Sequence, residues 1–350
     1  MRFERRDSVP ATLTVLAPLG AVLAALVIAG GLIALAGRNP LTAYGLILQG
    51  AFGSRLGLSE TLTRATPLIL TGLAAAVAFR ARLWNIGGEG QFYIGALAVP
   101  AFGLFPFVAG APATLAITFC LIAGALAGML LLLGPVLLKL RFGVDEVVTT
   151  LLLNFVVVLF VSMMIDGPLK DPLAFGWPQS VPVPSSAELP QLLDRTRLHA
   201  GLLIALTLPL AVWWLQSRTV FGLQSRAAGL NARAAAFAGV PLGRTLTLVA
   251  CLSGGLAGLA GAIEVMGVKG YVTTDLSPNY GYAGIVIAML AHLHPVGVIA
   301  AALFSAVMFV GADSMSRALG VPSYIADVIV AMSLLTMLVA IFLTQYRVRR

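Results

Sequence analysis

Apolar stretches long enough to cross a membrane follow one another along nearly the whole chain, and short polar stretches separate them. A spanning helix needs about 20 apolar residues. Two stretches, 90–138 and 276–312, are too long for one span, and prolines around Pro106 and the sequence HLHP at 292–295 divide them. The pattern predicts about ten spans, at 11–37, 65–79, two within 90–138, 147–165, 199–217, 245–263, about 282–293, one ending near 312, and 328–346.

The polar stretches differ in charge, and the difference predicts an orientation. If the N-terminus lies inside, the inner segments hold most of the 22 Lys and Arg residues. This agrees with the excess of basic residues in cytoplasmic loops. We therefore expect both termini in the cytoplasm, with the proline-rich stretch 166–197 outside the cell and the stretch 218–244 inside. The whole of 1–350 is expected to form a single membrane domain.

Composition supports the same class of protein. Hydrophobic residues make up 59% of the chain, charged residues only 10%, and the mean hydropathy is +0.97, whereas soluble domains carry about 25% charged residues. These values predict an all-α integral membrane protein with lipid as its surroundings. The net charge of +8 is then loop charge, and no nucleic-acid partner is expected. Cys120 and Cys251 lie in apolar stretches, where we expect small buried side chains.

Two pairs of segments resemble each other across the chain. LTGLAAAVAF at 70–79 resembles SGGLAGLAGA at 253–262, and RFGVDEVVTTLL at 141–152 resembles 317–335 once a few residues are gapped. In the predicted order the members of each pair lie an odd number of spans apart, so the repeat would be inverted. Inverted repeats with discontinuous helices are a common plan of membrane transporters.

The stretch NIGGEGQ at 85–91 places three glycines and a carboxylate between two apolar runs. Glycine costs about 1 kcal/mol per helical position relative to alanine, so the helix should be unwound here. One interpretation is a discontinuous helix that lines a transport path, with Asn85, Glu89, Gln91 and, from the fifth span, Asn154 as path residues. The other is a turn in which Glu89 caps a helix.

A short helix is predicted inside the cytoplasmic stretch. Asn231 is a favourable N-cap, the following residues to Ala238 are rich in alanine, Gly239 suits a left-handed C-terminal position, and Pro241 prevents continuation. Several apolar side chains, Phe237 among them, lie near four arginines. Such an apolar and basic helix indicates a docking surface.

The stretch FGLQSRAAGLNARAAAFAGV at 221–240 resembles the coupling-helix segment of bacterial ABC importer permeases of the ribose/branched-chain amino-acid superfamily. NIGGEGQ, FGVDEVVTTLLLN at 142–154 and SGGLAGLAGAIEVMG at 253–267 resemble its subgroup that imports nucleosides and simple sugars and is associated with basic-membrane-protein lipoproteins. The likeness covers about 39–344. It implies coupling to an ATPase through Phe221, Arg226, Gly229, Asn231, Ala235, Phe237 and Gly239.

The resemblance also implies a location and partners. The chain would be a multi-pass subunit of the bacterial inner membrane. Its partners would be an ATPase with two cassettes, a second homologous permease and an extracytoplasmic solute-binding lipoprotein. ATP and magnesium would bind the ATPase, with no cofactor on this chain, which lacks a GxxxxGK[ST] loop.

Other functions are less well supported. LSGG at 252–255 lies in an apolar span, where glycines let helices approach closely. The two histidines of HLHP lack further ligands nearby, so we expect loop residues and no metal site. An ion-coupled secondary carrier of small polar solutes is the alternative, although it needs ionisable residues within the membrane. An intramembrane enzyme would need a catalytic set that the sequence does not show.

Overall fold

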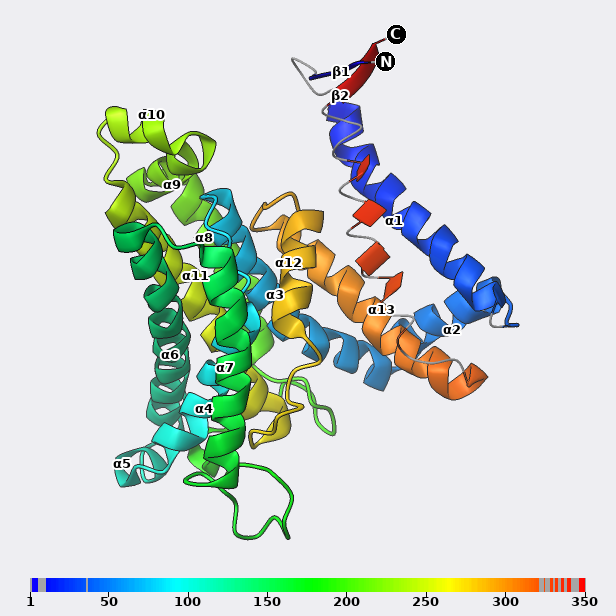
Figure 1. Cartoon of the computed structure of the whole chain (residues 1–350). Helices are drawn as coiled ribbons and strands as arrows, with labels where there is room; N and C mark the ends of the chain where they lie inside the picture. The colour runs from blue at the N-terminus through cyan, green and yellow to red at the C-terminus, as the bar shows by residue number, and fades with distance from the viewer. Residues whose placement is uncertain are drawn as a thin grey trace. The chain divides into compact units, whose positions relative to one another are not determined.

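The structure is a computed structural model. It describes residues 2–5, 11–35, 37–320, 324, 328–329, 331–332, 335–336, 339–340 and 346–349. The regular elements of the described part are helices, apart from two four-residue strands (Figure 1). Its elements are β1 (Arg2–Arg5), α1 (Ala11–Leu35), α2 (Pro40–Phe52), α3 (Arg55–Arg80), α4 (Gly88–Gly103), α5 (Pro106–Ala109), α6 (Ala113–Phe142), α7 (Glu146–Asp166), the 3-10 helix η1 (Ser185–Ala187), α8 (Gly201–Arg218), α9 (Val220–Leu230), α10 (Ala232–Phe237), α11 (Leu242–Glu264), the π-helix η2 (Val265–Lys269), α12 (Tyr280–Leu290), α13 (Gly297–Leu319) and β2 (Tyr346–Arg349).

Six of the described helical segments are long and apolar enough to cross a membrane: α3, α6, α7, α8, α11 with η2, and α13. The pair Leu19–Leu35 and Pro40–Phe52, bent by 115°, raises the number to seven if it is one broken span. The predicted third and eighth spans correspond to α4 and α12, which are shorter. The predicted tenth span lies mostly outside the described residues. A multi-pass helical protein is confirmed, while the count of ten and the inverted repeat stay predictions.

Two details of the helices differ from the sequence-based expectation. Helix α2 was not predicted, although its start carries clear signals: the Asn39 side chain accepts from the Leu41 N–H at 2.9 Å, and Pro40 occupies the first turn. The sixth span begins at Gly201, because His199 still belongs to the preceding loop. Cys120 is buried as expected, and Cys251 is half-buried.

The chain forms two compact units, Met1–Thr61 with Leu303–Arg350 and Leu62–Ala302. In the first unit, one face of α1 is buried through Ala21, Ala25, Ala29 and Ile33, four residues apart in the manner of a helix stripe. Strands β1 and β2 pair antiparallel, with Arg2 opposite Arg349. The two ends of the chain therefore lie side by side.

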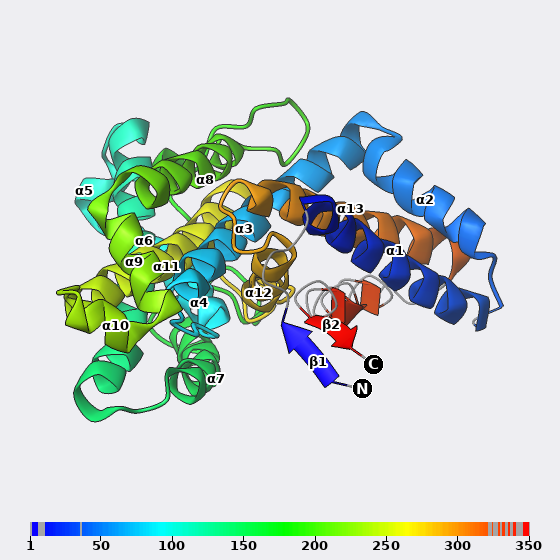
Figure 2. The ribbon, with the colours of Figure 1, turned by 90° about the horizontal axis from the view of Figure 1, so that it is seen from above.

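The second unit is held together where α4, α6 and α11 pack through glycines. A Cβ atom added at Gly95 would lie 2.1 Å from the Gly258 carbonyl oxygen, and one at Gly128 would lie 2.3 Å from that of Gly254. Only glycine permits backbones this close. The interpretation of the LSGG glycines as helix-packing residues is confirmed for Gly254, whereas a Cβ at Gly255 would make only an ordinary contact, 3.6 Å from the Ala125 carbonyl oxygen. Helix α12 packs on α3 in the same way, since a Cβ at Gly284 would lie 2.7 Å from the Thr71 carbonyl carbon (Figure 2).

The outer faces of α6 and α7 are apolar and exposed. Both helices are strongly apolar, yet only 28% of the most apolar stretch of each is buried within the described chain. Leu126 and Leu130 of α6, and Phe155 and Leu159 of α7, are among the exposed large side chains. Exposed apolar surface on this scale indicates contact with lipid.

The stretch 166–197 is a loop, as predicted, and it is ordered by hydrogen bonds to the segment around η2. The N–H groups of Ser180, Val183 and Leu189 donate to carbonyls at Val272, Gly270 and Met266, at 2.9, 2.7 and 2.9 Å. Figure 1 shows this loop at the end of α7 opposite to α9 and α10. The second unit therefore has an elbow end, which carries α9 and α10, and a loop end.

His199, at the loop end, makes stability depend on pH. Its ring is 0% exposed, its Nδ1 accepts from the Gly201 N–H at 3.1 Å, and its buried Nε2 has no partner in the described chain. Burial lowers the pKa of His199 to about 4, against about 6.5 when unfolded.

Between these two pKa values the unfolded chain binds more protons than the folded chain. The free energy of unfolding is therefore highest above about pH 6.5 and decreases as the pH falls towards 4. We expect this decrease to be about 3 kcal/mol, measured by thermal unfolding in detergent at several pH values. In the variant His199→Phe, the free energy of unfolding should depend less steeply on pH over this range. An unchanged slope would contradict the assignment to His199.

Candidate functional site

Residues 81–87 leave the helical conformation between α3 and α4, so a break is present as predicted. It lies earlier than the expected 85–91, because α4 begins at Gly88 and residues 88–91 are helical. Three side chains from the first turns of α7 accept hydrogen bonds from this broken segment and from the first turn of α4. The Trp84, Ile86 and Gly90 N–H groups donate to Glu146 Oε1, Thr150 Oγ1 and Asn154 Oδ1, at 3.4, 3.2 and 2.8 Å. These three side chains lie four residues apart on one face of α7. We call them the polar ladder: Glu146, Thr150 and Asn154. They satisfy backbone groups that unwinding has released.

The amide side chains of the motif bond to each other. Asn85 and Gln91 exchange two hydrogen bonds of 2.9 Å. Asn85 Nδ2 also donates to Ser253 Oγ of α11 at 3.0 Å, and Ser253 donates to the Ala74 carbonyl of α3 at 2.8 Å. The motif thereby joins α3, α4 and α11.

Asn154 and Glu89 connect the motif to further helices. Asn154 Nδ2 donates to the Ile86 carbonyl and to Tyr282 Oη, at 2.9 and 3.0 Å. Buried Glu89 lies in the first turn of α4, and its Oε2 accepts from the Gly281 N–H of α12 at 2.6 Å. The N-terminal ends of α4 and α12 therefore meet at one carboxylate, which complements both helix dipoles. Glu89 caps α12, a helix much further along the chain than the one considered from sequence.

The four predicted path residues, Asn85, Glu89, Gln91 and Asn154, are thus brought together, buried, and bonded to the chain itself. Contact between any of them and a solute stays a prediction. Sequence reasoning missed Thr150, Ser253 and Tyr282, because these residues join the cluster only through tertiary contacts.

The variant Thr150→Val should destabilise the fold by about 1–3 kcal/mol. It keeps the shape of the side chain but leaves the Ile86 N–H without its acceptor. The neighbouring Thr149→Val is the matched control, because the Thr149 hydroxyl bonds within its own helix, to the Asp145 carbonyl. Thermal unfolding in detergent compares the two. Equal stability of both variants would contradict the role of Thr150 in the polar ladder.

A second candidate site is the elbow formed by α9 and α10. The Thr219 side chain accepts from the Gly222 N–H at 3.3 Å and caps α9, and Asn231 accepts from the Ala234 N–H at 3.1 Å and caps α10. Gly239 has φ +84°, which ends α10 in the left-handed conformation. The predicted short helix and both of its ends are confirmed, while helix α9 was not predicted.

The predicted coupling residues face different surroundings in the elbow. Phe237 is 96% exposed and Asn231 is exposed, whereas Ala235 is buried and Phe221 is half-buried. Gly229 packs on the end of α3, where a Cβ would lie 2.1 Å from the Arg80 carbonyl oxygen. Within the elbow, Phe237 is therefore the most exposed large apolar side chain, and Val220, Leu223 and Leu230 of α9 are exposed as well. Whether these residues couple to an ATPase stays a prediction.

A cavity of about 540 Å³ opens at the loop end. Aromatic, hydroxyl, amide and charged side chains line it together, a mixture that suits polar organic solutes. Trp177 is 75% exposed there, so an aromatic face is available for stacking. The lining residues are Trp177, Pro178, Gln179, Lys269, Tyr271, Thr273, Thr274 and Asp275.

No group of three or more His, Cys, Asp or Glu side chains that could hold a metal ion occurs among the described residues. The HLHP segment forms the turn between α12 and α13, in which His292 and Leu293 adopt positive φ angles of 49° and 58°.

The fold and these sites define a multi-pass membrane protein with a broken, internally bonded helix and an exposed helical elbow. Residues 57–341 match the family described as branched-chain amino acid transport system / permease component, and the chain belongs to this family.

Three relatives agree with this membership. The glucose ABC transporter permease protein of Haloferax volcanii is 34% identical over 99% of this chain and 93% of its own length. The guanosine ABC transporter permease protein of Bacillus subtilis is 34% identical over 91% and 92%. The nucleoside ABC transporter permease protein of Lactococcus lactis is 32% identical over 91% and 89%.

Proposed function

We propose that this chain is the transmembrane permease subunit of an ATP-driven importer for nucleosides or simple sugars. Its family membership and the names of its relatives support this function. ATP hydrolysis then belongs to a separate ATPase subunit, and no cofactor is expected on this chain. The structural observation that favours an ATPase bound to this chain is the exposed Phe237 on a short capped helix.

The connections of the elbow suggest how a movement of the ATPase would be transmitted to the transport path. Helix α9 follows α8, α10 precedes α11, and Gly229 touches the end of α3. Ser253 of α11 bonds to Asn85 of the broken segment and to the Ala74 carbonyl of α3. A displacement of the elbow by the ATPase would therefore shift α3, α11 and the broken segment together.

We propose that Asn85, Glu89, Gln91 and Asn154 shape the path by holding this segment, and that the path itself carries few fixed charges. A polar but uncharged cargo agrees with such a path, because a phosphate would need a basic cluster. The cavity at the loop end, with Trp177 and its polar neighbours, would receive the cargo outside the membrane.

The pairing of β1 with β2 supports an orientation with both termini on one side, since the chain ends must then share a compartment. The distribution of basic residues along the chain supports our proposal that the elbow also lies in the cytoplasm, with the chain in a bacterial inner membrane. The family implies an ATPase and a solute-binding protein as partners. We expect two cassettes in the ATPase, a second homologous permease and a lipoprotein as the binding protein.

Reconstitution distinguishes this function from an ion-coupled carrier. Full-length chain alone in liposomes, under an imposed proton or sodium gradient, should accumulate neither labelled guanosine nor labelled glucose. Addition of the cognate ATPase, sister permease, binding protein and Mg-ATP should produce uptake of one of them. Uphill accumulation by the chain alone would overturn the proposal.

A further inference from the structure

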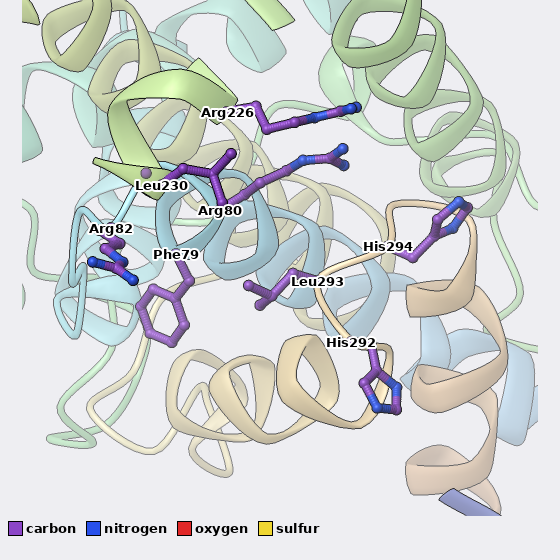
Figure 3. Close-up of a pocket in the computed structure, with 9 residues that line it drawn as sticks. Phe79, Arg80, Arg82, Arg226, Leu230, His292, Leu293 and His294 are labelled. Carbon is purple, nitrogen blue, oxygen red and sulfur yellow. The ribbon is translucent and has the colours of Figure 1, made fainter. Parts of the chain in front are cut away.

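A basic cavity of about 460 Å³ lies at the elbow end, inside the unit Leu62–Ala302 (Figure 3). Three parts of the chain form it: the end of α3 with the start of the broken segment, the last turns of α9, and the turn between α12 and α13. Its volume falls in the range of small-molecule sites, about 300–1,000 Å³. The lining residues are Phe79, Arg80, Arg82, Arg226, Gly229, Leu230, His292, Leu293 and His294.

The charges around this cavity are all of one kind. Arg80, Arg82 and Arg226 line it, and no Asp or Glu is among the lining residues. In the part of the chain that the structure describes, no carboxylate forms an ion pair with any of the three. The positive charges of Arg80 and Arg226 act on each other, and Figure 3 shows their side chains extending in the same direction. An anion placed between them would relieve this repulsion.

The Arg80 guanidinium is held in position. Its Nη1 donates to Gln216 Oε1 of α8 at 2.8 Å, and the close contact of Gly229 with the Arg80 carbonyl fixes α9 against the end of α3. A positioned guanidinium offers several N–H groups in a planar fork that matches phosphate or carboxylate oxygens. The ordering of one arginine before binding lowers the entropic cost of binding an anion.

The backbone around the cavity is also unusual. Arg82, His292 and Leu293 have φ angles of 53°, 49° and 58°. They are half of the six non-glycine residues with positive φ in the described chain. Such conformations are uncommon and gather at ligand sites, where the surrounding structure holds them. The turn that presents the two histidines is thus built into a fixed shape.

Apolar side chains line the cavity together with the charged ones. Phe79, Leu230 and Leu293 contribute carbon surface beside the three guanidinium groups. A bare inorganic anion would leave this surface and most of the volume unused. A phosphate group joined to a ring would use both, with the phosphate on the arginines and the ring against Leu230 and Leu293.

We propose that this cavity binds a phosphate monoester of a ring-bearing small molecule, such as a nucleoside monophosphate or a sugar phosphate. A bound ester would tie the end of α3 to α9 and to the turn after α12, so it would favour one position of the elbow. Its action from the cytoplasm rests on the orientation in the proposed function. Binding itself does not depend on that orientation.

Binding of adenosine 5′-monophosphate to the full-length chain in phosphatidylcholine nanodiscs, which expose both membrane faces, tests the proposal. We expect saturable binding that inorganic phosphate displaces and adenosine does not. The double variant Arg80→Gln/Arg226→Gln, and separately Arg82→Gln, should weaken binding about tenfold or more. Arg218→Gln is the control: it removes an exposed arginine at the same end, outside the cavity, and should bind as the unaltered chain does.

Unfolding temperature and size-exclusion elution identify a variant that fails to fold. If the double variant fails to fold, the binding measured for Arg82→Gln tests the proposal, and the reverse also holds. Equal binding by all variants, or none by the unaltered chain, would overturn the proposal. Loss of binding in phosphatidylglycerol nanodiscs would assign the cavity to a lipid headgroup. Loss of binding after assembly with the ATPase would assign it to an acidic side chain of that subunit. Either of these losses would also overturn the proposal of a soluble ester, without affecting the proposed transport function.

Discussion

Replacing Phe237 by alanine should reduce ATP-driven uptake about tenfold or more while leaving the chain folded in the membrane. Phe237 is 96% exposed on α10, so its removal costs the isolated chain little. A large aromatic side chain at the centre of an interface contributes 2 kcal/mol or more to binding, roughly a 30-fold change in affinity. Uptake into proteoliposomes and co-purification of the ATPase measure the two consequences.

Phe155→Ala is the matched control for Phe237→Ala. Phe155 is 61% exposed, but it lies on the lipid-facing side of α7. Its removal should leave both uptake and ATPase binding near their original values. If Phe237→Ala behaves like Phe155→Ala, the elbow is not the coupling surface. Ala235, another predicted coupling residue, is a poor probe, because it is buried and a larger side chain there would disturb the elbow itself.

Gly128→Ala should destabilise the second unit strongly, by about 1–3 kcal/mol or more. The added Cβ would lie 2.3 Å from the Gly254 carbonyl oxygen and 2.7 Å from the Gly258 Cα. Both are backbone atoms, so the contact is relieved only if α6 and α11 move apart. Because α4 packs on the same glycines, the separation should extend to the broken segment. The unfolding temperature in detergent measures the change.

Gly255→Ala on α11 provides the comparison. A Cβ atom added at Gly255 would lie 3.6 Å from the Ala125 carbonyl oxygen, an ordinary contact distance, and alanine favours the helix by about 1 kcal/mol relative to glycine. The variant should be as stable as the original chain or slightly more stable. A similar loss of stability in both variants would mean that helix propensity, and not close packing, explains the result for Gly128.

Local signals in the sequence were sufficient for much of the fold. The cap at Asn231 and the left-handed Gly239 predicted α10, since both act within a few residues of the chain. The glycines of NIGGEGQ predicted a helix break for the same reason, although the break lies at 81–87 and two of the three glycines belong to the first turn of α4. Helix α2 carried an equally local signal at Asn39 and Pro40 that the apolar pattern alone did not reveal.

The partners of the broken segment could not be predicted in this way. Glu89 bonds to a backbone N–H that lies 192 residues further along the chain, and Asn85 bonds to Ser253 of α11. No periodicity relates such residues, because their proximity arises only when α4, α7, α11 and α12 pack together. Helix packing also explains two other features that the sequence did not predict. Ala235 is buried, and Arg80, Arg226 and His292 line one cavity.

The sequence by itself determined that this is a multi-pass helical membrane protein, that one stretch of helix is interrupted, and that a short capped helix lies between two long ones. Hydrophobic length, glycine content and capping act locally, so they can be read along the chain. Only the tertiary structure decided which groups satisfy the unwound backbone, which face of the elbow is exposed, and which arginines share a cavity. Those properties depend on the close approach of helices far apart in sequence, which the packed glycines permit.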